Sequence, residues 1–140
     1  MKRLLMAVAL FFVGCASLPP RGLQFTPRVA NNLQFLFDRV DTEFAFCVFG
    51  RIERGVMKIE RVEIPFIQAA TQEFVFYYFC DGPQFLGMGH SHMKGVPCQF
   101  SETDYKTLLN NDAEYGFLVC ENSKFSVYSR KEVLKKKPPG

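Results

Sequence analysis

Residues 87–104 of the 140-residue chain read GMGHSHMKGVPCQFSETD, and this stretch contains a strand, a loop and the start of a helix. The run from Leu86 to His92 predicts a strand. Ser101, followed three residues later by the acid Asp104, is typical of a helix start at which a hydroxyl caps the first turn. The stretch therefore predicts a strand–loop–helix unit whose helix runs from Ser101 to Asn111.

The sequence on both sides of this unit predicts one more helix and several short strands. Thr26-Pro27 places a capping hydroxyl before a proline, and the apolar residues that follow recur at helical spacing to about Arg39. Phe74 to Cys80 (FVFYYFC) is almost wholly apolar, which predicts a central strand. The remaining predicted strands are Phe44 to Phe49, Val56 to Ile67 with a bulge, and a hairpin of Gly116 to Cys120 with Phe125 to Tyr128. The chain therefore predicts one α/β domain.

His90 and His92 are the two histidines of the whole sequence, and they stand two residues apart. On a strand, residues at i and i+2 point to the same face, so both imidazoles can contact one ion. An isolated His-x-His or Ser-x-x-Asp is more often structural than functional. Together with the Asp104 carboxylate, however, the two imidazoles form a three-ligand set of the kind that holds zinc and leaves one position open for water.

The spacing of these residues resembles the signature of the JAMM (MPN/Mov34-type) zinc metalloprotease family. His90-Ser91-His92 is followed by a gap of eight residues and then by Ser101-x-x-Asp104, and Glu43 precedes the hydrophobic run FAFCVFG. The similarity covers residues 28–129. It implies an α/β fold, with a single MPN/JAMM-type domain over residues 26–129 and a mixed β-sheet flanked by helices in a cytidine-deaminase-like layout.

The same resemblance implies a role for each matching residue. His90, His92 and Asp104 are expected to bind Zn²⁺ as the cofactor. Glu43 is expected to act as general base toward the zinc-bound water and to pass the proton to the leaving amine. Ser101 is expected to stabilise the oxyanion of the tetrahedral intermediate. The implied activity is zinc-dependent hydrolysis of a peptide or isopeptide bond, with a peptide or protein as substrate.

The chain departs from the family pattern at three points. Met93 stands where proline usually follows the second histidine, the gap before Ser101 is eight residues instead of the common seven, and Phe46 replaces a small residue. The first two affect the loop beside the metal, and the third affects core packing. Two alternatives to catalysis stay open: a non-catalytic MPN-type protein-binding module, and a structural zinc site that Cys98 closes as a fourth ligand.

The N-terminus predicts export. Residues 1–16 read MKRLLMAVALFFVGCA, in which a basic start precedes a short apolar run and small residues, as in a secretory signal. Phe12-Val13-Gly14-Cys15 resembles a bacterial lipobox. We therefore predict a lipoprotein signal peptide over residues 1–15, a lipid on Cys15 and a tether over residues 16–25, with ordinary signal cleavage just after this cysteine as the alternative. The predicted location is the bacterial cell envelope, as an outer-membrane lipoprotein that faces the periplasm and contacts the membrane through its N-terminal lipid anchor.

The formal net charge of +3 is concentrated at the two ends of the chain. Residues 130–140 hold five basic residues and one acid, which predicts a basic disordered tail. Between this tail and the leader, 10 basic residues oppose 13 acidic ones. Because a nucleic-acid binder needs a basic face to neutralise phosphates, we predict no nucleic-acid partner.

Four cysteines remain when Cys15 is set apart: Cys47, Cys80, Cys98 and Cys120. In an oxidising compartment they are expected to form disulfides. Four cysteines allow three complete pairings, and the sequence alone does not choose among them. Cys80 with Cys98 is the candidate pair.

Overall fold

The computed structural model describes residues 20–77 and 80–136. The predicted signal peptide and its Cys15 lie outside these residues. No helix in the described part of the chain is both long enough and apolar enough to cross a membrane. In chain order the elements are β1 (Gly22–Phe25), α1 (Pro27–Arg39), β2 (Ala45–Glu53), β3 (Val56–Glu63), β4 (Ile67–Ala70), β5 (Val75–Tyr77), β6 (Phe85–Ser91), α2 (Glu102–Asn110), β7 (Tyr115–Cys120), the 3-10 turn η1 (Glu121–Ser123), β8 (Lys124–Ser129) and α3 (Arg130–Lys136).

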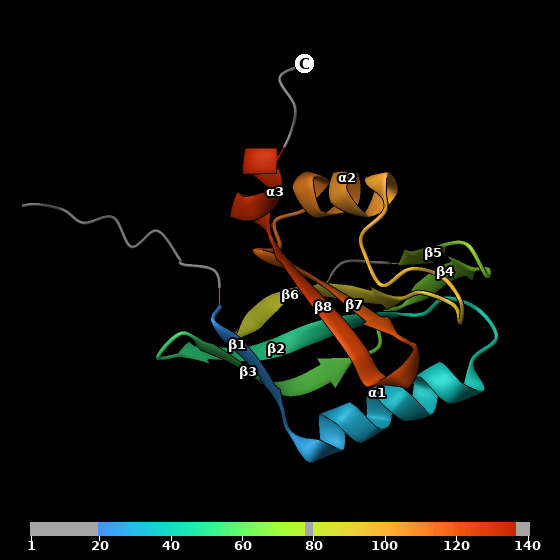
Figure 1. The fold of residues 1–140 in the computed structure, drawn as a ribbon, viewed down its shortest axis with the longest axis horizontal. Coiled ribbons are helices and arrows are strands. Elements are labelled where there is room, and N and C mark those ends of the chain that lie inside the picture. Colours follow the sequence, from blue (N-terminus) through green and yellow to red (C-terminus); the bar gives the residue numbers. More distant parts are fainter. Residues whose placement is uncertain (1–19, 78–79, 137–140) are drawn as a thin grey trace, which may run out of the picture.

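Six strands form one mixed sheet in the order β1-β3-β2-β6-β7-β8, and β4 and β5 pair separately. β6 runs parallel to β7, with α2 in the connection between them, and β1 runs parallel to β3. α1 covers one face of the sheet, while α2 and α3 lie over the other (Figure 1). The prediction of a single α/β domain with a mixed sheet flanked by helices is confirmed.

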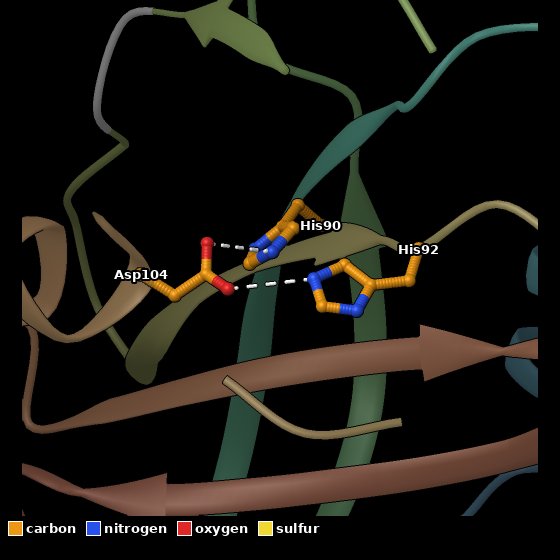
Figure 2. A group of neighbouring side chains, drawn as sticks. All are labelled: His90, His92 and Asp104. Carbon is orange, nitrogen blue, oxygen red and sulfur yellow. Dashed lines mark ion pairs between the residues drawn. The ribbon is translucent and has the colours of Figure 1, made fainter. Parts of the chain in front are cut away.

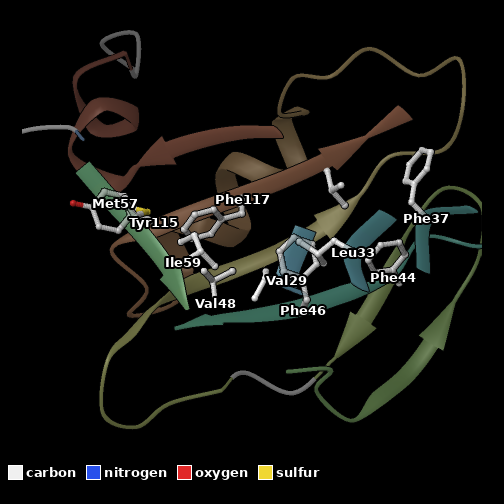
Figure 3. Packing of buried hydrophobic residues seen from close by; sticks show 11 residues of the cluster. Val29, Leu33, Phe37, Phe44, Phe46, Val48, Met57, Ile59, Tyr115 and Phe117 are labelled. Atoms are coloured by element: carbon white, nitrogen blue, oxygen red, sulfur yellow. The ribbon is translucent and has the colours of Figure 1, made fainter. Parts of the chain in front are cut away.

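The main core lies between α1 and the sheet (Figure 3). α1 contributes a stripe of three buried residues at helical spacing, Val29, Leu33 and Phe37. The helix begins as predicted, because the Thr26 hydroxyl accepts a hydrogen bond from the Val29 N–H and Pro27 takes the first helical position. β2 contributes Phe46 and Val48 to this core, and the candidate site lies at the end of the neighbouring strand β6.

Phe46 is accommodated by a glycine on the neighbouring strand. It lies opposite Gly89 in the β2–β6 ladder, and its side chain is 1% exposed. A Cβ atom placed on Gly89 would overlap the Phe46 ring. The Phe46 ring on β2 therefore fills the space beside Gly89 on β6, which a larger residue at position 89 would occupy. This compensation explains how the core tolerates Phe46 where the family pattern has a small residue.

The prediction of a central strand over residues 74–80 is wrong. Among the described residues of this run, only residues 75–77 form a strand, β5, and it pairs with β4 outside the main sheet. The place beside β2 is taken by β6. Tyr77 and Cys80 instead pack against the sheet face around Cys47. A continuous apolar run can cover a sheet face as well as occupy a sheet centre, and hydrophobicity alone does not separate the two.

The prediction of a tether over residues 16–25 is wrong for its last four residues. Residues 22–25 form β1, which pairs with β3, and the Thr26 N–H continues the contact by donating to the carbonyl oxygen of Ile59. Leu23 and Phe25 pack against the main core. An alternation of only two apolar residues is too short to be distinguished from a linker in the sequence.

The prediction of a disordered tail over residues 130–140 is wrong for residues 130–136, because these residues form α3. The hydroxyl of Ser129 donates to the Glu132 carboxylate and accepts from the Glu132 N–H, which caps the helix. Val133 is buried at 6% exposure. The Arg130 guanidinium donates to carbonyl oxygens at the end of α2. The high basic content of the segment predicted solvation, but these contacts order it.

Candidate metal centre

β6 carries His90 to the sheet face under α2, and His92 follows directly after the strand. His90 lies opposite Ala45 in the β2–β6 ladder. Ser91, between the histidines, lies on the opposite face and is 2% exposed. Its Oγ accepts a hydrogen bond of 2.9 Å from the Phe44 N–H, and its own N–H donates to the Phe44 carbonyl oxygen at 2.9 Å. Ser91 thus joins the end of β6 to the residue that precedes β2.

α2 carries Asp104 to the two histidines. Ser101 is the N-cap of this helix, and its Oγ accepts a hydrogen bond of 3.2 Å from the Asp104 N–H. In return, the Ser101 N–H donates to Oδ2 of Asp104 at 2.7 Å. This reciprocal capping box confirms the helix start that the sequence predicts. It also holds the Asp104 carboxylate in place independently of its contacts with the histidines.

The side chains of His90, His92 and Asp104 converge (Figure 2). Nε2 of His90 lies 3.0 Å from Oδ1 of Asp104, and Nε2 of His92 lies 3.4 Å from Oδ2. One ligand atom from each residue lies within 4.8 Å of the other two. The side chains are 12%, 8% and 15% exposed, in the same order, so the cluster is largely shielded from water. The three predicted metal ligands are therefore grouped as a potential metal-binding site.

Two details of the histidines fit a metal ion better than a simple ion pair. Nε2 of His90 is buried and has no hydrogen-bond partner among the described residues, although it lies 3.0 Å from Oδ1 of Asp104. Nδ1 of His92 lies 2.9 Å from the carbonyl oxygen of Pro97. A carbonyl oxygen only accepts, so Nδ1 carries a hydrogen and Nε2 of the neutral ring presents its lone pair to the site. Two imidazoles and a carboxylate are a donor set that zinc favours.

Electrostatic coupling within the cluster is strong. Burial acts to raise the pKa of Asp104, but His90, His92 and the Ser101 N–H stabilise the carboxylate and hold its pKa far below the usual range. Burial acts to lower the pKa of His92, yet the contacts with Asp104 and the Pro97 carbonyl outweigh it and raise that pKa. In the metal-free protein Asp104 is therefore an anion that favours protonated His92, and protons compete with a metal ion for this ring.

Glu43 lies beside the cluster, two residues before β2, and is 8% exposed. Its backbone N–H donates to the carbonyl oxygen of Thr71, in the turn between β4 and β5, at 2.7 Å. Burial raises the pKa of Glu43. The nearby His90 and His92 act to lower this pKa, and the charge of Asp104 acts to raise it further. These couplings indicate that its carboxyl is near the three candidate ligands, although it does not belong to the group. Such a carboxyl can take up and release a proton at the site.

Tyr77 is a neighbour of the site that sequence reasoning missed. Burial, with a smaller contribution from the charge of Asp104, raises the pKa of Tyr77 to about 12. The sequence predicts a central strand over this residue, and nothing in its local pattern relates it to Asp104. Ser91 and the carbonyl group of Pro97 were missed for a similar reason, because their roles depend on contacts that only the folded loop creates.

The candidate pairing of Cys80 with Cys98 is wrong. The disulfides are Cys47–Cys80 and Cys98–Cys120. Cys80 follows β5, which packs over β2, whereas Cys98 lies in the loop that docks on β7 and β8, so the two are held by different strands. Because the sulfur of Cys98 is in a disulfide, it offers no thiolate to a metal ion. The alternative of a structural zinc site closed by Cys98 is therefore also wrong.

Comparison with known proteins finds likeness at the level of structure. No protein-family model matches the chain, and no curated protein matches its sequence. A JAB1/MPN domain protein from Archaeoglobus fulgidus is 16% identical, with 80% of this chain and 92% of that protein covered and a TM-score of 0.47. A structure described as JAMM, a metalloprotease-like zinc site in the proteasome and signalosome, is 19% identical, with 79% and 89% covered and a TM-score of 0.47. The case for a metal centre in this chain therefore depends on its own residues.

Proposed function

We propose that this chain is a zinc-dependent metalloprotease of the JAMM type that hydrolyses a peptide or isopeptide bond. The observation that carries the proposal is the convergence of His90, His92 and Asp104, with the buried carboxyl of Glu43 beside them. These four residues occupy the positions that the family signature reserves for three ligands and a base. The convergence supports the signature, because residues separated by up to 61 positions come together at one place.

In this proposal His90, His92 and Asp104 bind the ion and leave a position for water or substrate. Bound zinc supplies a Lewis acid that polarises the scissile carbonyl and makes water more acidic. The surrounding protein keeps the ligands in place. The capping box with Ser101 orients Asp104, and the Pro97 carbonyl sets the ring of His92.

Glu43 is the proposed general base. It takes a proton from the attacking water and delivers it to the leaving amine. A carboxyl whose pKa is raised by burial suits both steps, because its pKa lies closer to the operating pH than that of an exposed glutamate. The Ser101 hydroxyl accepts one hydrogen bond from the Asp104 N–H and can donate its own hydrogen to the carbonyl oxygen on which negative charge develops.

The proposed location and substrate come from the sequence. A lipid on Cys15 would anchor the domain to a membrane of the bacterial envelope, with the outer membrane and a periplasmic orientation as the specific proposal. The proposed substrate is a peptide or protein available in that compartment. The two disulfides support an oxidising location, where such bonds persist.

Zinc content and proteolysis together test the proposed activity. We expect the purified domain to contain one zinc ion and to cleave members of a peptide library, and Glu43→Gln to keep the zinc but lose cleavage. Glu60→Gln is the control, because Glu60 is an exposed glutamate on β3. Unchanged cleavage by Glu43→Gln would refute the assigned base, and absence of zinc from the wild-type protein would refute the metal site.

A separate experiment tests the anchor. The full chain should incorporate labelled palmitate when it is expressed in bacteria, and Cys15→Ala should abolish both the labelling and the membrane fractionation. Equal labelling of Cys15→Ala and wild type would rule out lipidation at this cysteine.

A further inference from the structure

The loop between His92 and α2 begins at a candidate metal ligand and contacts the ring of that ligand. Nδ1 of His92 donates to the carbonyl oxygen of Pro97, 2.9 Å away. Pro97 directly precedes Cys98, which forms a disulfide. The carbonyl group that contacts the ring is therefore part of the peptide bond between Pro97 and this cysteine. Nε2 of the same ring lies on its Asp104 side, 3.4 Å from Oδ2.

The loop itself has few contacts that fix this carbonyl. Residues 94–97 are exposed, and the Val96 N–H bonds back to the carbonyl oxygen of Met93 in a turn within the loop. Cys98, in contrast, is held by two contacts with neighbouring strands. Its carbonyl oxygen accepts from the hydroxyl of Ser126 at 3.2 Å, and its sulfur is joined to Cys120.

Cys120 anchors the loop to the same place on the sheet that holds the backbone of His92. It is the last residue of β7 and is 2% exposed. The carbonyl oxygen of its neighbour Val119 accepts a hydrogen bond of 3.0 Å from the His92 N–H. The contacts of His92 with Pro97, the disulfide between Cys98 and Cys120, and the hydrogen bond from the His92 N–H to Val119 therefore form a closed ring of contacts. Within this ring, the disulfide is the covalent link between the loop and β7.

We propose that Cys98 and Cys120 are positioning residues of the metal centre, whose disulfide holds the Pro97 carbonyl against His92 and thereby sets the metal affinity. This inference depends on the metal site of the proposed function. Loss of a partner that orients a ligating histidine typically weakens metal binding by about 10- to 100-fold. The other disulfide, Cys47–Cys80, makes no such link to His92 and provides a matched control.

The test compares Co²⁺ and Zn²⁺ binding by wild type, the double variant Cys98→Ser/Cys120→Ser, and the control Cys47→Ser/Cys80→Ser. The visible absorption of bound Co²⁺ reports the ligand geometry, and chelator competition gives the zinc affinity. We expect the first variant to bind zinc at least about 10-fold more weakly than wild type, with an altered Co²⁺ spectrum. The control should keep the wild-type spectrum and affinity even where its thermal stability falls.

A second readout uses the metal-free protein at a pH above the raised pKa of His92. Long-range ¹H–¹⁵N spectra should show the Nδ1–H tautomer of His92 in wild type and in the control, and a mixture of tautomers in Cys98→Ser/Cys120→Ser. If that variant does not fold, reduced Cys47→Ser/Cys80→Ser, freed of reductant, replaces it in both measurements and is compared with its own oxidised form, because its reduction breaks Cys98–Cys120 and cannot break Cys47–Cys80.

Wild-type affinity in a folded protein that lacks the Cys98–Cys120 bond would overturn the inference while leaving the proposed metal site intact. Tighter binding by either protein would overturn it too; in the reduced protein it would mean that a freed thiolate joins the ligands. Failure of the wild-type protein to bind either metal would refute the metal site itself, and with it this inference.

Discussion

Replacing Gly89 by alanine should destabilise the protein because the room beside this glycine is already filled. A Cβ atom at position 89 would overlap the ring of Phe46 and stand 3.0 Å from the Cβ atom of Phe117. Phe46 and Phe117 are 1% and 2% exposed, so neither can move aside into solvent. The added methyl group must therefore displace packed side chains or the backbone of β6.

The size of the effect follows from two opposing contributions. Forcing an extra methyl group into a packed core costs about 1–3 kcal/mol. The reduced freedom of alanine in the unfolded chain returns about 0.4–1 kcal/mol. We therefore expect Gly89→Ala to lower the free energy of unfolding by about 1–2 kcal/mol and the melting temperature by roughly 4–8 °C.

Thermal and denaturant unfolding of Gly89→Ala, Phe46→Leu and the double variant tests this explanation. Because leucine makes room for the new methyl group, the double variant should be more stable than the sum of the single effects allows, by about 1 kcal/mol. Gly22→Ala is the control, since a Cβ atom there meets Val56 at an ordinary 3.8 Å. Wild-type stability of Gly89→Ala, or strict additivity in the double variant, would refute the reasoning.

Three further predictions concern the surroundings of the site. Ser101→Ala removes the N-cap of α2 and should cost about 1 kcal/mol in thermal unfolding, whereas Ser101→Thr should retain most of that stability. Zinc affinity, measured by titration calorimetry across pH, should fall as the pH drops through the raised pKa of His92, because protons then occupy the ring; affinity that stays constant below the ordinary histidine pKa would contradict this. Arg130→Ala removes donors to the carbonyl oxygens at the end of α2 and should cost about 1–3 kcal/mol, with faster amide exchange in α2. The control is Arg28→Ala, at an exposed position in the first turn of α1, which should leave the free energy of unfolding and the amide exchange of α2 unchanged.

The parts of the site that could be predicted from the sequence depend on short-range geometry. The two-residue spacing of His90 and His92 places them on one side of the sheet, and the three-residue spacing of Ser101 and Asp104 marks a capped helix start. Both arrangements are present in the structure. Each involves residues close together in the chain, where backbone geometry alone limits the possible positions.

The predictions that failed required knowledge of contacts between distant segments. The run at residues 74–80 has the composition of a central strand, but β6 occupies that place and the run packs on a sheet face. The segment from residue 130 has the composition of a solvated tail, but hydrogen bonds from Arg130 to the end of α2 order this segment. Composition describes what a segment tolerates, while its neighbours decide where it lies.

The order of residues along the chain specifies which side chains are available for a metal centre and which of them share a local face, because strand and helix periodicity act over only a few residues. Contacts between distant segments place the start of α2 against the end of β6, pack Phe46 over Gly89 and pair Cys98 with Cys120. These outcomes depend on how strands far apart in the chain are ordered in the sheet. That order follows from the packing of the whole core, to which many residues contribute.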